Sequence, residues 1–305
     1  MPMTKFPSKY NVAMSVEASH HAYSDETHHN FGRFKGIAVI SASLDEATLA
    51  SREVGTLLAE VNLSELKWEK LRTARDRVGA LKIAELFFRK LDVLRADILT
   101  WDIEDSRHRL HGRDDVENMH RMYHHLLKDV LRKRWPTGAK WRLYPDQQDS
   151  IDWERVHDIL DNAGTVAQFQ SELSKPLTFR LQLKRDFSVV QVVPSQSHVE
   201  PLIQLADLMA GMAAFSRTHI DTYRAWKRQA SGQTSLFDLP IEKFSRGEQE
   251  KCAFLANFKD RCRKLGLSVS LNSTNGLRTH DQRGALNFWH YEPQRQSDKA
   301  PTRNR

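Results

Sequence analysis

One buried carboxylate constrains this chain more than any other feature. The stretch from His198 to Phe215, HVEPLIQLADLMAGMAAF, is apolar around nearly its whole circumference when it is drawn as a helix of about 3.6 residues per turn. Asp207 lies within this stretch. Burying an ionised carboxylate is unfavourable unless a metal ion, a basic side chain or a backbone cap pairs with it. The sequence therefore predicts a buried helix whose Asp207 has a partner elsewhere in the chain.

Strand-like and helix-like segments alternate along the chain, which favours an α/β or α+β core. The predicted strands are a weak first strand within 12–25, then 34–42, 93–102, 141–144, and an antiparallel pair of 177–183 with 187–193. The predicted helices are 43–61, 76–90, 116–134, 151–162, the Asp207 helix, 218–228 and 242–265. A hairpin of 267–271 with 286–291 is expected to close the chain.

The length of 305 residues accommodates one large domain with an extension. We expect a core over residues 1–220, a C-terminal extension over 221–292 packed on that core, and a disordered basic tail over 293–305. No apolar run is long enough to span a membrane, and the N-terminus lacks the apolar segment of a secretory signal, so we expect a cytoplasmic protein. The two cysteines, Cys252 and Cys262, indicate neither a disulfide framework nor a zinc knuckle.

The charge of the chain favours a polyanionic partner. The net charge is +7 and the pI is about 9.4. Basic side chains cluster at 72–77 and 128–142, and the second block also contains Trp135 and Trp141, which either stack on bases or belong to the core. The side chains expected to follow a nucleic-acid backbone are Arg72, Arg75, Arg132, Lys133, Arg134 and Lys140.

Acidic residues follow three of the predicted strands. They are Asp25 with Glu26, Asp102, and Asp146. If the strands lie side by side, these residues and Asp207 meet at one edge of the sheet. Carboxylates within about 4 Å repel by roughly 4 kcal/mol per pair at an effective dielectric of about 20, so such a cluster takes up protons or binds a hard cation such as Mg²⁺. The alternative is that each Asp caps a turn or helix, and that Asp207 forms a salt bridge with Lys67 or an arginine.

Histidines offer a rival metal site. They are His20, His21, His28 and His29 around Asp25, and His108 and His111 in an HxxH pattern. These side chains could hold Zn²⁺ or Mn²⁺. Adjacent histidines on a strand point to opposite faces, however, so at most one of each pair can face a common centre. A single histidine that positions water or protonates a leaving group fits the pattern better. The sequence contains no P-loop, no dinucleotide-binding glycine motif and no nucleophile elbow.

Three motifs resemble, in order and spacing, the signatures of the family known as domain of unknown function 3800. They are YSDET at 23–27, ELKW at 65–68 and IQLADLMAG at 203–211, and the resemblance covers residues 1–220. That family is similar in architecture to the ribonuclease H-like superfamily, and its members occur in bacterial and phage-related genomes. The resemblance implies an α/β fold: a ribonuclease H-like mixed sheet flanked by helices, here with a helical plus hairpin C-terminal extension. DETHH replaces the usual DESG-like turn, and the strand before Asp25 is unusually polar.

The resemblance also implies a set of functional residues. They are Asp25, Glu26, Glu65, Lys67, Gln204 and Asp207, with Asp146 at a strand end and Ser195 and Ser197 before the QLAD helix. We expect a metal-dependent nuclease or related phosphodiesterase that acts on DNA or RNA, with Asp25, Glu26, Lys67 and Asp207 as catalytic residues. Mg²⁺ or Mn²⁺ would be held by Asp25, Asp102, Asp146 and Asp207. Lys67 would neutralise a carboxylate or contact the scissile phosphate, unless it merely pairs with Glu65 or Glu69.

A non-catalytic role remains open as the alternative. In that case the chain binds nucleic acid or a partner protein of a bacterial or phage defence or toxin system without cutting, alone or as a homo-oligomer. An incomplete cluster of carboxylates would favour this alternative, because catalysis of this kind needs the metal ligands to converge. No membrane partner is expected.

Overall fold

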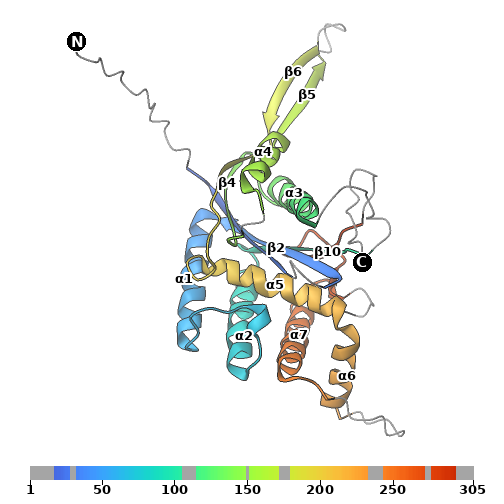
Figure 1. Ribbon diagram of the computed structural model, residues 1–305. Coiled ribbons are helices and arrows are strands. Elements are labelled where there is room, and N and C mark those ends of the chain that lie inside the picture. The colour runs from blue at the N-terminus through green and yellow to red at the C-terminus, as the bar shows by residue number, and fades with distance from the viewer. Residues whose placement is uncertain are drawn as a thin grey trace, which may run out of the picture.

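A six-stranded mixed sheet runs through the middle of the protein (Figure 1). The computed structural model describes residues 17–27, 32–104, 115–148, 151–171, 179–232, 243–271 and 276–292. The sheet order is β10-β3-β2-β1-β4-β7. Its strands are β1 (His20–Thr27), β2 (Phe34–Ser43), β3 (Arg95–Asp102), β4 (Ala139–Pro145), β7 (Phe187–Val192) and β10 (Leu286–His290). Strand β2 is antiparallel to β1 and β3, whereas the pairs β1–β4, β4–β7 and β3–β10 are parallel.

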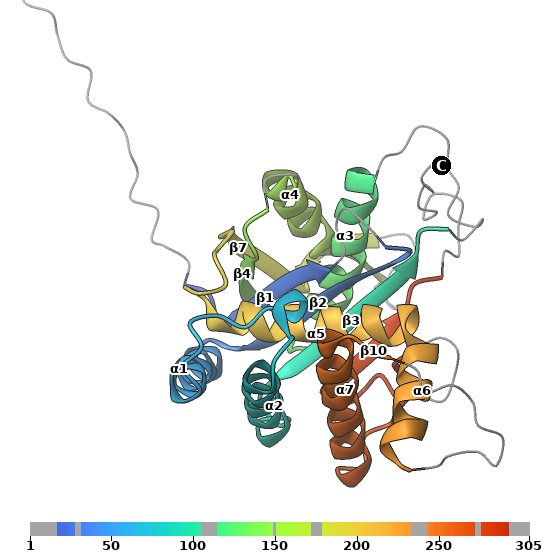
Figure 2. The same ribbon diagram turned by 60° about the horizontal axis from the view of Figure 1, so that its bottom comes forward.

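Helices cover both faces of this sheet (Figures 1 and 2). The helix α5 (Pro201–Thr218) lies against one face, with α1 (Leu44–Glu60), α2 (Ala74–Arg89), α6 (Ile220–Ala230) and α7 (Arg246–Lys264) on the same side. The opposite face carries α3 (Asp115–Lys133) and α4 (Trp153–Ala163). The predicted fold class, α/β with a mixed sheet flanked by helices, is therefore confirmed.

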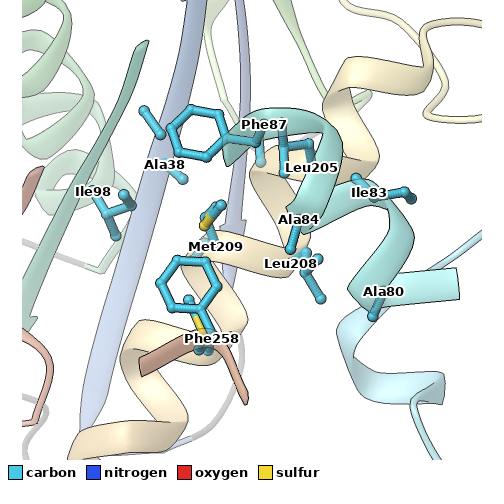
Figure 3. Close-up of a cluster of buried hydrophobic side chains, with 14 of the residues drawn as sticks. Ala38, Ala80, Ile83, Ala84, Phe87, Ile98, Leu205, Leu208, Met209 and Phe258 are labelled. Atoms are coloured by element: carbon cyan, nitrogen blue, oxygen red, sulfur yellow. The ribbon is translucent and has the colours of Figure 1, made fainter. Parts of the chain in front are cut away.

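The alternation of side chains along the strands divides the core into two parts. Ala38 and Ile40 of β2 pack with α5, whereas Ile37 and Val39 pack on the side of α3. Every residue of α5 from Leu202 to Arg217 is buried, as the apolar sequence predicts. Figure 3 shows Leu205, Leu208 and Met209 of α5 among side chains of the sheet, α2 and α7. Each buried Leu or Met contributes roughly 1.5–3 kcal/mol, so α5 is a central source of stability.

Two predicted strand pairings are wrong. Strand β7 joins the main sheet parallel to β4, and β6 (Phe179–Arg185) pairs instead with β5 (Thr165–Ser171) in a separate ribbon that extends away from the sheet (Figure 1). The predicted closing hairpin is also wrong: β8 (Val269–Ser270) pairs with β9 (Arg278–Thr279), and β10 lies beside β3. Strand β10 buries Leu286 and Phe288 in the α5 core, which a hairpin on the surface would leave exposed.

The C-terminal segment contributes to the central sheet through β10. The boundary near residue 220 stays a prediction, and residues 293–305 lie outside the described residues. Within the described ranges, no helix is both long and apolar enough to cross a membrane.

Candidate functional site

Two side chains of α5 hold the segment that carries the ELKW motif. Gln204 Oε1 accepts a hydrogen bond from the Leu66 backbone N–H at 2.7 Å, and Asp207 Oδ2 accepts one from the Trp68 N–H at 2.5 Å. Gln204 and Asp207 are three residues apart and so lie on one side of the helix. The backbone of Lys67 is extended (φ −127°, ψ 136°), which turns the two flanking N–H groups in the same direction. A backbone cap is therefore one partner of the buried Asp207.

Lys67 places its ammonium group among carboxylates from three other elements. Its Nζ lies 3.0 Å from Asp146 Oδ2 and 3.5 Å from Asp25 Oδ2. Burial alone would lower the pKa of Lys67, but the charges of Asp25, Asp207 and Asp146 together raise that pKa well above its ordinary value. Three of the carboxylates predicted to meet, those of Asp25, Asp146 and Asp207, therefore lie around one lysine, which offsets part of their charge.

The register of the sheet explains why Asp25 and Asp146 meet. Strands β1 and β4 are parallel, with Ser24 opposite Pro145. The residues that follow these two, Asp25 and Asp146, therefore lie side by side. The Asp146 N–H continues the pairing by donating to the Ser24 carbonyl at 2.8 Å. Asp25 shares a face of β1 with Tyr23, which packs in the α5 core, and this brings its carboxylate toward Asp207.

The cluster carries more negative than positive charge. Burial, followed by the charges of Asp207 and Glu26, raises the pKa of Asp25 well above its usual value. Burial raises the pKa of Asp207 to about 6, although Lys67 and the Trp68 N–H favour its ionised form. One ammonium group therefore faces three carboxylates, and the site favours a further proton or a cation.

The donor set fits a hard divalent cation that takes the position of the Lys67 ammonium. In the part of the chain that the structure describes, no group of three or more His, Cys, Asp or Glu side chains forms a ready metal site. The oxygens of Asp25 and Asp146 that face Lys67 Nζ nevertheless mark a cation position. Mg²⁺ is commonly held by one or two carboxylates together with water and substrate phosphates. These residues thus fit Mg²⁺ or Mn²⁺ if Lys67 moves away from them.

An open depression of about 450 Å³ lies beside the carboxylates and admits a ligand from solvent. Glu65, Lys67 and Asp146 line it together with Gln147, Gln196, Ser197 and His198. Ser197 Oγ donates to Glu65 Oε1 at 2.6 Å, and the Ser197 carbonyl accepts from Gln204 Nε2 at 2.8 Å. Ser195, by contrast, donates to the Val193 carbonyl. The sequence did not predict Gln147, Gln196 and His198 as lining residues, because loop residues have no periodic pattern. The signal that could have identified them is their closeness in sequence to Asp146 and to the QLAD helix.

Asp102 does not join the cluster. It lies opposite Phe34 of β2, whereas Asp25 lies opposite Ala38, and this four-residue offset corresponds to about 13 Å along the strands. There Asp102 accepts two hydrogen bonds from Arg33, at 2.9 and 2.7 Å. Against the effect of burial, Arg33 holds the pKa of Asp102 below its usual value. The structure therefore separates Asp102 from the other predicted metal ligands.

Glu26 faces away from Asp25. Neighbouring residues of a strand point to opposite faces, so Glu26 lies on the α3 side and accepts a hydrogen bond from the Tyr123 hydroxyl. Burial raises the pKa of Glu26 to about 7 despite this bond. The position gives no support to the prediction that Glu26 acts beside Asp25.

The predicted nucleic-acid contacts are dispersed. Arg72, Arg75 and Lys140 are exposed, whereas Arg132 pairs with Asp186, Lys133 with Asp129, and Arg134 with Asp97 and Asp129. The two tryptophans of the basic block 128–142 contribute to the interior. Trp141 is fully buried, and Trp135 donates a hydrogen bond from Nε1 to Ser41 Oγ.

The histidines form no common centre among the described residues. His21 is buried against Tyr23 and Tyr144, and burial lowers its pKa to about 4. His20 packs on Trp135 and Trp141. The other four histidines of the rival site, His28, His29, His108 and His111, lie outside the described residues.

Comparison with known proteins places the chain among relatives of unknown activity. No protein-family model matches it, so membership of the domain of unknown function 3800 family is not confirmed. A chain of the solved "PCNA:RNase HII complex from Archaeoglobus fulgidus" is similar with a TM-score of 0.40 and 14% identity, over 71% of this chain and 90% of that one. The "Uncharacterized protein ORF2'" of Methanothermobacter thermautotrophicus is 35% identical over 92% of this chain and 97% of its own length. The "Uncharacterized protein ORF2" of the same organism is 34% identical over the same shares. The chain belongs to the family that contains these two proteins.

Proposed function

We propose that this protein is a metal-dependent phosphodiesterase that acts on nucleic acid. The observation that supports this most is the approach of Asp25, Asp146 and Asp207, from three separate elements, to one partly buried ammonium group beside an open depression. Three carboxylates around a single lysine leave an excess of negative charge that a divalent cation can neutralise.

The residues of the site have two roles: some would hold a cation, and others position the ELKW segment. Asp25 and Asp146 would hold Mg²⁺ or Mn²⁺, with Asp207 as the third carboxylate. Such an ion lowers the pKa of a bound water and stabilises charge on phosphate oxygens. Asp207 and Gln204 keep the ELKW segment in place through backbone N–H groups. Lys67, once it leaves the carboxylates, is close enough to the depression to contact a phosphate.

A second candidate function is binding without cleavage. It is favoured by the ion pairs of Lys67 with Asp25 and Asp146, because a lysine that stays there would occupy the cation position permanently. The protein would then hold nucleic acid or a partner protein. A role in bacterial or phage defence and a homo-oligomeric state stay predictions in both cases.

A cleavage assay separates these functions. Labelled single- and double-stranded DNA and RNA are incubated with the protein in Mg²⁺, Mn²⁺ or chelator, beside Asp25→Asn and Asp207→Asn. Asp102→Asn is the matched control, since it removes one carboxylate outside the cluster. We expect metal-dependent cleavage that falls by about 100-fold or more in the first two variants, in line with the several kcal/mol that a metal site supplies, and is retained in the control. Metal-independent cleavage, or equal rates in all variants, would contradict the proposal.

A further inference from the structure

A second cavity, of about 540 Å³, lies between α3 and the C-terminal strands β9 and β10. Strand β10 is three strands away from β1 in the sheet, a distance of about 14 Å. Trp289 and Tyr291 of its lining pack against the α3 core, on the face opposite to Asp25. This cavity shares no lining residue with the depression beside Lys67. A ligand bound here would therefore occupy a separate site.

Cationic side chains line the cavity from two sides. Lys128 and Arg132 are four residues apart on α3 and so lie on one face of that helix, and Arg278 of β9 faces the same cavity. Within the described ranges, neither Lys128 nor Arg278 forms an ion pair, and Lys133 keeps 65% of its side chain exposed beside Asp129. Basic residues near a helix C-terminus can simply stabilise the helix dipole. That explanation covers Lys133 but not Arg278, which belongs to a strand.

Aromatic side chains lie next to these charges. Trp289 is half-buried and lines the cavity, and the Tyr291 ring lies 5.2 Å from the His125 ring, centroid to centroid. Backbone-tracking cations beside aromatic rings are the usual combination for binding single strands, because an unpaired base offers its face for stacking. A duplex hides its base faces, so the rings would have nothing to stack on.

We propose that this cavity binds a single strand of nucleic acid, with Lys128 and Arg278 contacting phosphates and Trp289 stacking on a base. The inference rests on the proposed function only in taking nucleic acid as the ligand. It adds that the strand is held by unpaired nucleotides at a place distinct from the carboxylates. Binding and cleavage are then separable by mutation.

Fluorescence anisotropy with labelled oligothymidylate, in chelator, tests this proposal. Lys128→Glu and Arg278→Glu should each weaken single-strand binding by about tenfold and reduce the slope of log affinity against log salt by about one. Trp289→Leu should weaken it by about tenfold as well, because a stacked base is lost. The matched control is Arg228→Glu, an exposed position on α6 with the same charge change, which should bind as the wild type does. The duplex of the same strand should bind more weakly than the single strand.

The proposal is overturned if the three cavity variants, shown by circular dichroism to be folded, bind the single strand as the control does. It is also overturned if polyglutamate competes as well as the unlabelled strand. The second result would indicate an acidic peptide as the ligand. Asp25→Asn is measured in the same assay and should bind normally. If the wild type shows no metal-dependent cleavage but binds the strand at this cavity, the proposed function alone is contradicted. If the wild type cleaves with metal but the cavity variants bind as the wild type does, this inference alone is contradicted.

Discussion

At the scale of single residues, the site depends on how one lysine and three acids share charge. The sequence predicted that Asp207 needs a partner and that acids at strand ends meet, and both expectations agree with the contacts of Lys67. It did not distinguish Asp146 from Asp102, because an acid at a strand end has the same sequence pattern whether the register brings it to the centre or leaves it beside Arg33. It also grouped Glu26 with Asp25 as a catalytic residue, although the alternation of side chains along a strand was enough to separate them.

Replacement of Lys67 tests this distribution of charge. In the absence of divalent ions, Lys67→Met should lower the free energy of unfolding by about 2 kcal/mol. Removing one partner of a fully buried ion pair costs roughly 3–5 kcal/mol, and the loss here is smaller because Lys67 and Asp146 are partly exposed. Mg²⁺ should then raise the melting temperature more in the variant than in the wild type, because the lysine no longer competes with the ion. The control is Lys70→Met, which removes an exposed lysine that pairs with Glu65. An equal response of both variants to Mg²⁺ would count against the cation position.

At the scale of elements, α5 positions the site by holding the segment before α2. Trp68, in the short helix η1 (Trp68–Lys70), packs so closely on α5 that a Cβ at Gly211 would lie 2.1 Å from its Cγ. The helices and buried strands were predictable, because long periodic segments identify them. The pairing of β5, β6, β8 and β10 was not, because a short strand takes its partner from burial elsewhere in the fold.

Gly211→Ala should therefore disturb both stability and the site. We expect a loss of about 1–3 kcal/mol in urea unfolding, typical of an overpacked core, with lower cleavage activity because the Lys67 segment shifts. Gly55→Ala in α1 is the matched control: its added Cβ meets nothing within 4 Å. That substitution should stabilise the protein by about 0.5–1 kcal/mol, since Ala is the better helix former. If both alanine variants behave alike, the close packing of Trp68 on α5 is not what positions the segment.

At the scale of the whole molecule, buried polar contacts fasten the C-terminal strand to the sheet. Asn287 Nδ2 of β10 donates to Asp97 Oδ1 of β3 at 2.8 Å, and Arg134 and Arg95 donate to the carbonyls of Gln282 and Gly284. This explains why Arg134, expected on a nucleic-acid surface, is largely buried. The sequence could not predict it, because a basic block is the same pattern whether its members face solvent or a buried acid.

The burial of Asp97 makes the stability of the fold depend on pH. Burial raises the pKa of Asp97 to about 6, so between its ordinary value and 6 the folded protein binds more protons than the unfolded chain. The contribution of protonated Asp97 to the free energy of unfolding is complete at low pH. It is lost as pH rises through 6, which lowers the free energy of unfolding by about 3 kcal/mol. Asp97→Asn should flatten this fall in urea unfolding measured from about pH 4 to about pH 7. The exposed Asp92→Asn should leave it unchanged, and an unaltered slope in Asp97→Asn would show that other groups set the dependence.

The most direct test of the cation site is an Mn²⁺ titration followed by electron paramagnetic resonance. The carboxylates around Lys67 should give saturable Mn²⁺ binding in the wild type and in Asp102→Asn, and that binding should be lost in Asp25→Asn and Asp146→Asn. Undiminished binding by Asp25→Asn, or none by the wild type, would contradict a divalent-ion site at this position.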